Sequence, residues 1–392
     1  MADFLTNIWV QRIGFALGGL VLGLLVEKLI VKRAIPFVSA GLDQGESMTI
    51  SCNLPRCLSV ALLLLTLATS TYVVALEGQS GSPPSQPPAN WGPISINLED
   101  VPYPHPVRFM ERTLYGQNVR IAYMDVAPVG PPNGRTVVLL HGGSYYGWYW
   151  EETIEVLRNA GFRVVVKDRL GWGRSSKPIL PYSMNLHASN TYALLESLDI
   201  SEAAVVGHSM GGQMASRFAF LYPEVTTHLV MVNAIGLTDS RSGRGWREPV
   251  GGSAMPDLQR VYQSNLALEQ RRVVDWKPEF LEHVRIRYGM YLSGEWPRLS
   301  LVRAMANNAR SIDTVVHDWP QIETKALVIG GAEDGPDFPE RARAAADALQ
   351  NGQLILIPNV GHNPHLEAPE IFNAELIRFL GSGSSTSGIQ RW

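Results

Sequence analysis

A short apolar run ends at a serine between two glycines. Residues 203–206 are followed by GHSMG at 207–211 and then by a stretch with helical spacing. A serine at so tight a turn from strand to helix is typical of an exposed nucleophile on a strained backbone. Gly207 and Gly211 are expected to remove side chains that would collide with the neighbouring chain. The pattern therefore predicts a nucleophilic Ser209.

Two later loops supply a base and an acid. A serine hydroxyl needs a base to take its proton and a third group to orient that base, in the chain order Ser, acid, His. His362 follows an apolar run at 353–357 and is the predicted base, with His365 as the alternative. Asp334 follows the run at 325–330 and is the predicted acid, with Glu333 and Asp337 as alternatives.

An earlier loop can complete an oxyanion hole, which needs two backbone N–H donors. His141-Gly142-Gly143 follows the apolar run 136–140. Glycines there let the backbone approach a substrate closely. We expect the N–H groups of Gly143 and Met210 to be the donors, and His141 to brace the loop by hydrogen bonding.

Strands and helices alternate through the folded part of the chain, which favours a parallel sheet covered on both faces. The expected strands are 119–126, 136–140, 162–166, 203–206, 228–233, 325–330 and 353–357. The expected helices are 150–160, 186–198, 213–221, 339–349 and 370–380. Because parallel strands place their carboxyl ends at one edge, the candidate serine, acid and base should meet there.

The alternation of strands and helices is interrupted between residues 236 and 323, where helical segments are expected near 257–268, 278–288 and 297–309. We interpret this insertion as a helical cap over the site. The expected domain plan is a membrane-associated region 1–76, a Pro/Gly/Ser-rich linker 77–100, core 101–235, cap 236–323, core 324–382 and a disordered tail 383–392.

The N-terminal region contains two apolar stretches, 13–26 and 58–76, and Lys32, Arg33 and Arg56 lie between them. The positive-inside rule would place that connection in the cytoplasm and the rest of the chain outside. Alternatively, translation begins at Met48 and 58–76 belongs to a cleaved signal peptide. Both interpretations predict a membrane-anchored or exported, periplasmic or extracellular, catalytic domain; it is cytoplasmic if these segments are not used.

The composition excludes several classes of function. The net charge of −3 and 18% charged residues give no basic surface for nucleic acid. Both cysteines, Cys52 and Cys57, precede the folded part, so that part has no thiol nucleophile or thiolate metal site. The histidines lack metal-ligand spacing, and the glycines of the loop 168–175 do not make a phosphate-binding motif. We expect no metal, no cofactor and a small-molecule substrate; the sequence does not indicate an oligomeric state.

Taken together, the motifs at 141–143, 168–175, 207–211, 331–334 and 361–362 resemble those of the capped α/β-hydrolase superfamily, in order and spacing. The resemblance implies an eight-stranded, mostly parallel sheet with a helical lid after the sixth strand. It also implies cofactor-free chemistry through a Ser209–His362–Asp334 triad. The chain is similar to esterases and to the epoxide-hydrolase group, but the latter uses an aspartate nucleophile where Ser209 stands.

Within that superfamily we expect a serine hydrolase that forms an acyl-enzyme, acting on carboxylic esters with an apolar or aromatic group. A carbon–carbon bond hydrolase, a lactonase or a proline-iminopeptidase-like peptidase is the alternative. A non-catalytic ligand-binding protein on the same fold is a more distant one.

Overall fold

The computed structural model describes residues 82–241 and 257–381. The apolar stretches 13–26 and 58–76, Met48 and the expected tail 383–392 lie outside these residues. In the described ranges, no helix is long and apolar enough to cross a membrane.

Eight strands form one sheet in the order β1-β2-β4-β3-β5-β6-β7-β8. The pairs β1·β2 and β2·β4 are antiparallel, whereas the strands from β4 to β8 run parallel to one another. The strands are β1 Val107–Leu114, β2 Gln117–Val126, β3 Thr136–Leu140, β4 Arg163–Lys167, β5 Ala203–His208, β6 Thr226–Val232, β7 Lys325–Gly331 and β8 Gly352–Ile357. The predicted α/β fold with an eight-stranded, mostly parallel sheet is confirmed.

Helices cover both faces of this sheet. Helices α4 (Met184–Ser197), α5 (Met210–Leu221) and α9 (Phe338–Ala348) contribute to the apolar cluster on one face, and α3 (Glu151–Asn159) and α11 (Pro369–Gly381) to the cluster on the other. Successive side chains of a strand point to opposite faces. In β5, accordingly, Ala203 and Val205 pack into the first cluster, and Ala204 and Val206 into the second. Both clusters hold the carboxyl ends of the central strands rigidly, which suits a catalytic edge.

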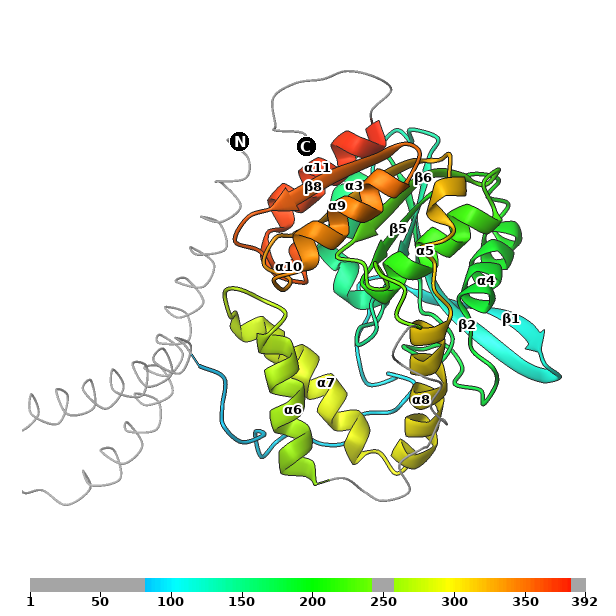
Figure 1. The fold of residues 1–392 in the computed structure, drawn as a ribbon. Helices are drawn as coiled ribbons and strands as arrows, with labels where there is room; N and C mark the ends of the chain where they lie inside the picture. Colours follow the sequence, from blue (N-terminus) through cyan, green and yellow to red (C-terminus); the bar gives the residue numbers. More distant parts are fainter. Residues whose placement is uncertain (1–81, 242–256, 382–392) are drawn as a thin grey trace, which may run out of the picture. The chain divides into compact units, whose positions relative to one another are not determined.

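Three helices interrupt the alternation between β6 and β7. They are α6 (Leu258–Gln270), α7 (Leu281–Leu292) and α8 (Trp296–Ile312), and we call them the cap helices. Figure 1 shows them grouped together on one side of the sheet and its helices. The side chain of Asp257 caps α6 by accepting from the N–H groups of Gln259 and Arg260, which explains why the helix begins there.

The described part of the expected linker contacts the cap helices. The hydroxyl of Tyr262 in α6 donates to the carbonyl of Pro84, 2.5 Å away, and the N–H of Ile94 donates to the carbonyl of Gly289 in α7. Farther along, Leu98 and Val101 are buried in an apolar cluster that includes residues of α7 and α8. These contacts tie the segment that precedes β1 to the cap helices.

Short helical elements complete the described chain: η1 Gly147–Trp150, η2 Pro278–Phe280, η3 Trp319–Gln321 and α10 Pro364–Glu367. Strand β1 was not predicted from the sequence. It lies at the edge of the sheet with alternating exposure, and its residues VRFMERTL carry too many charged side chains for an apolar pattern to be visible.

Candidate active site

Ser209 occupies the junction of β5 and α5 in a left-handed backbone conformation, with φ 56° and ψ −118°. Such φ values are uncommon and costly for residues other than glycine. The junction persists because its neighbours are glycines. A Cβ at Gly207 would lie 2.0 Å from the carbonyl oxygen of Gly211, and one at Gly211 would lie 2.2 Å from that of Leu140. The two glycines therefore allow α5 to start directly against β5 and β3.

His362 and Asp334 meet at the same edge of the sheet. Asp334 follows β7 and His362 follows β8, and His362 Nδ1 lies 2.7 Å from Asp334 Oδ2. A carboxylate accepts the proton on Nδ1, so the neutral ring has its lone pair on Nε2, as a general base requires. The geometry joins Asp334 to His362. Neither alternative contacts His362 by a hydrogen bond in the described residues: Glu333 is exposed, and Asp337, which lines the same cavity, pairs with Arg341 at 2.8 Å.

Asn233 fixes the orientation of the acid. It follows β6 with φ 37°, and its side-chain amide donates to Asp334 Oδ2 over 3.0 Å. Its amide oxygen accepts from the N–H of Gly331, 3.0 Å away. Sequence reasoning missed Asn233, although a polar residue directly after an apolar strand at this edge was the available signal.

A chain of hydrogen bonds connects the loop at Gly142 to the base loop. The N–H of Gly142 donates to the hydroxyl of Tyr149, and that hydroxyl lies 2.9 Å from His208 Nδ1. His208 Nε2 lies 2.8 Å from the carbonyl of His362. A carbonyl only accepts, so Nε2 carries the proton and Nδ1 accepts from Tyr149. Burial lowers the pKa of His208, which keeps it neutral. His208 thus bridges the two loops.

The loop His141–Gly143 lies against the serine. A Cβ on Gly142 would come within 3.1 Å of Ser209 Cβ, whereas one on Gly143 would meet no atom within 4 Å. The space beside Gly143 is therefore open. His141 Nδ1 donates to the carbonyl of Gly142, and its Nε2 accepts from the N–H of Arg169, as expected for a bracing role. That bond holds the peptide unit whose N–H belongs to Gly143.

The side chains of Arg169 and Trp172 hold the next peptide unit. Arg169 Nη2 and Trp172 Nε1 both donate to the carbonyl of Gly143, at 3.0 and 2.7 Å. The neighbouring Asp168 accepts from the N–H groups of Gly147 and Arg174 and organises the same loop. The loop 168–175, whose glycines make no phosphate-binding motif, therefore holds the shape of the candidate oxyanion loop.

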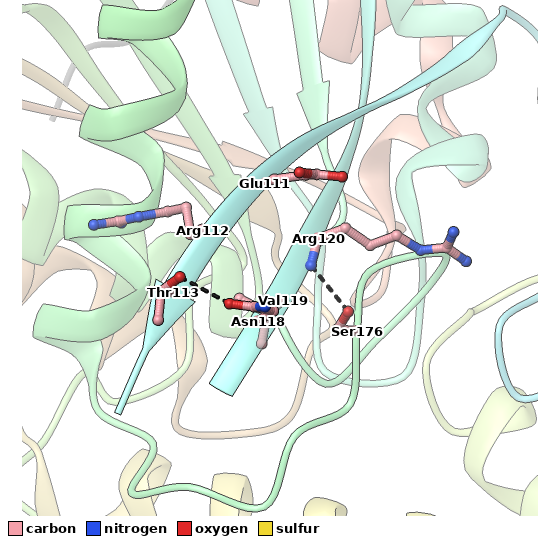
Figure 2. Close-up of a pocket in the computed structure, with 7 residues that line it drawn as sticks. All are labelled: Glu111, Arg112, Thr113, Asn118, Val119, Arg120 and Ser176. Carbon is pink, nitrogen blue, oxygen red and sulfur yellow. Dashed lines mark hydrogen bonds between the residues drawn. The ribbon is translucent and has the colours of Figure 1, made fainter. Parts of the chain in front are cut away.

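A cavity of about 290 Å³ adjoins the acid and base. Asp334, His362, Leu237 and Phe338 are among its lining residues. A larger depression of about 510 Å³ lies on the β1–β2 hairpin and Ser176, as Figure 2 shows, and none of the predicted site residues lines it. His365, the alternative base, is buried with its ring 4.4 Å from that of Trp150 and no hydrogen-bond partner among the described residues.

A family model described as "Alpha/beta hydrolase family" matches residues 137–375, more than half of the chain. The chain belongs to the α/β-hydrolase family. Its motifs and its sheet agree with that membership, so the resemblance inferred from the sequence is confirmed.

Known proteins similar to this α/β hydrolase are enzymes of several kinds. A 2-hydroxy-6-oxononadienedioate/2-hydroxy-6-oxononatrienedioate hydrolase from Paraburkholderia phymatum is 27% identical over 275 residues, which are 68% of this chain and 92% of that protein. A putative non-heme chloroperoxidase from Synechocystis is 26% identical over 270 residues, which are 63% of this chain and 91% of the other. The crystal structure of a probable hydrolytic enzyme from Pseudomonas aeruginosa has a TM-score of 0.68 at 33% identity and covers 74% of this chain and 99% of its own.

Proposed function

We propose that this α/β hydrolase is a serine hydrolase that cleaves carboxylic esters through an acyl-enzyme on Ser209. The observation that carries the proposal is the strained Ser209 at the β5–α5 junction, together with a His362–Asp334 pair 2.7 Å apart at the same edge of the sheet. Backbone strain of this kind is concentrated at functional sites.

The proposed reaction uses these residues in two steps. Ser209 Oγ attacks the ester carbonyl while His362 Nε2 takes its proton, and the N–H groups of Gly143 and Met210 stabilise the oxyanion. His362 returns the proton to the departing alcohol. Water, deprotonated by His362, then attacks the acyl-enzyme, and the imidazolium returns that proton to Ser209 Oγ as the acid is released. Asp334 keeps the proton of His362 on Nδ1 and stabilises the imidazolium that forms in each step.

A carbon–carbon bond hydrolase is the second candidate, and one comparison favours it. The Paraburkholderia relative is named for hydrolysing a 2-hydroxy-6-oxo dicarboxylic acid. The same serine, base and oxyanion donors would serve such a reaction, because it also proceeds through attack on a carbonyl carbon. The two candidates differ in the leaving group, which is an alcohol for an ester and a carbon acid for the alternative.

A substrate panel separates these candidates. The full-length protein and Ser209→Ala are assayed on p-nitrophenyl esters of increasing acyl length and on a 2-hydroxy-6-oxo-dienoate, whose chromophore is lost on cleavage. Ester turnover that disappears in Ser209→Ala supports the proposal. Cleavage of the dienoate with a kcat/KM well above that for every ester would replace it with the carbon–carbon hydrolase.

A further inference from the structure

Arg169 carries a buried positive charge that no carboxylate of the described residues neutralises. Its side chain, in the loop after β4, is 1% exposed. Nη2 donates to the carbonyl of Gly143 and Nη1 contacts the sulfur of Met210, so the guanidinium touches both residues proposed for the oxyanion hole. Its Nε has no hydrogen-bond partner among residues 82–241 and 257–381. Nor does any ion pair join it to an acid in those ranges.

The other buried arginines of the described chain are paired. Arg217 contacts Asp318 at 2.6 Å and Asp313 at 3.1 Å, and Arg287 contacts Glu269 at 2.6 Å. Burying a charge is strongly unfavourable unless an opposite charge compensates it, which explains those pairs. Arg169 is the exception, and it lies at the reaction centre.

A second guanidinium contacts the same tryptophan as the first. Arg303 comes from cap helix α8, and its Cζ is 4.7 Å from the ring centroid of Trp172, while the Cζ of Arg169 is 3.5 Å from the same centroid. Arg303 Nε is also buried without a hydrogen-bond partner in the described part of the chain. Burial and the charge of Arg303 lower the pKa of Arg169, but a guanidinium stays protonated in a protein.

We propose that Arg169 and Arg303 bind a carboxylate carried by the substrate, beside the carbonyl that Ser209 attacks. The planar guanidinium presents parallel N–H groups that match the two oxygens of a carboxylate. The core supplies one cation and the cap helices the other, so the anionic group would be held between them. This inference rests on the proposed serine chemistry and specifies its substrate class.

The test compares two esters that differ in one terminal group. p-Nitrophenyl hexanoate ends in a methyl group, and the mono-p-nitrophenyl ester of adipic acid ends in a carboxylate. For the full-length wild type, kcat/KM should be at least tenfold higher for the adipate ester. Arg303→Met should lower kcat/KM for the adipate ester about tenfold and change that for the hexanoate ester less than twofold. Arg260→Met, which removes an exposed charge from cap helix α6, should change neither.

The results separate this inference from the proposed function. Equal kcat/KM values for the two esters in the wild type, or an equal loss of both in Arg303→Met, would overturn the carboxylate site. Fluorophosphonate labelling of Ser209 in the same samples reports the serine chemistry: labelling without the preference refutes only this inference, and no labelling refutes the proposed function.

A protection experiment tests the carboxylate site without substrate turnover. The rate of fluorophosphonate labelling is measured with hexanoate or hexanamide present, which differ in charge but hardly in size. In the wild type, hexanoate should slow labelling at a concentration more than tenfold lower than hexanamide does. Arg303→Met should abolish this difference. Equal protection by both compounds would contradict the proposal.

Discussion

Replacing Asp334 by asparagine tests the orientation of the candidate base. The substitution keeps the shape of the side chain, and the amide oxygen can still accept from Asn233, so the fold should survive. It removes the negative charge 2.7 Å from His362 Nδ1, while an amide oxygen at the position of Oδ2 can accept from both Asn233 and that ring nitrogen. The variant therefore removes the charge of the acid and leaves its hydrogen bonds in place.

The expected loss follows from the geometry. With charge centres about 4 Å apart and an effective dielectric constant of about 20, the carboxylate stabilises the imidazolium by about 4 kcal/mol, a factor of roughly 10³ in rate. Replacement of the acid by asparagine in serine triads costs about 10⁴ in kcat, which is the upper limit of the expected loss. We therefore expect kcat for a p-nitrophenyl ester to fall between about 10³- and 10⁴-fold, with KM little changed.

The neighbouring acids supply matched controls. Glu333→Gln and Asp337→Asn remove the same charge from the same loop, and both side chains are exposed, so each should change kcat less than twofold. Thermal unfolding of all three variants checks that the fold is intact. A value for Asp334→Asn within tenfold of the wild type, or a large loss in either control, would refute the assignment of the acid.

The remaining predictions concern the turn, pH dependence and the N-terminal region. Gly207→Ala should lower the free energy of unfolding by about 3 kcal/mol or more, because its Cβ would lie 2.0 Å from a backbone oxygen. Gly143→Ala, whose Cβ meets no atom, should change that free energy by less than about 0.5 kcal/mol. Equal urea midpoints for the two variants would contradict this prediction. Burial lowers the pKa of His228 to about 4, so the unfolded chain binds more protons between about pH 4 and 6.5 and stability should fall on acidification. After allowance for solvent screening, the free energy of unfolding measured with urea should fall by about 1 kcal/mol between pH 7.5 and pH 5. His228→Gln should not show this loss, and an equal loss in that variant would assign the effect to other groups. A reporter fused after Leu76 should be active only outside the cytoplasm, and activity confined to the cytoplasm would contradict export.

The sequence was sufficient for the elements whose pattern is local. The run before Ser209, the glycines around it and the acid and base after later strands each carry a signal within a few residues, and the parallel sheet then requires them to meet. Strand 136–140 was predicted with its observed bounds, and the cap helices began within a few residues of their expected starts.

Contacts between distant residues were not predictable in the same way. The bonds from Tyr149 to His208 and from Asn233 to Asp334 join side chains that are 59 and 101 positions apart, and no periodicity records them. The sequence does not single out Arg169, because only the fold shows that it is buried and pairs with no acid among the described residues. Edge strand β1 was not predicted, because Arg112 interrupts its less exposed face and Phe109 lies on its exposed face, so no apolar alternation is visible.

Covalent labelling of the serine tests the central claim most directly. The full-length protein is treated with a fluorophosphonate probe, alongside Ser209→Ala and His362→Ala, and the modified peptide is identified by mass spectrometry. The account predicts one phosphonylated residue, Ser209, with labelling absent in Ser209→Ala and at least 10³-fold slower in His362→Ala, because the base activates the hydroxyl. A folded wild type that stays unlabelled, or one labelled at a different residue, would contradict it.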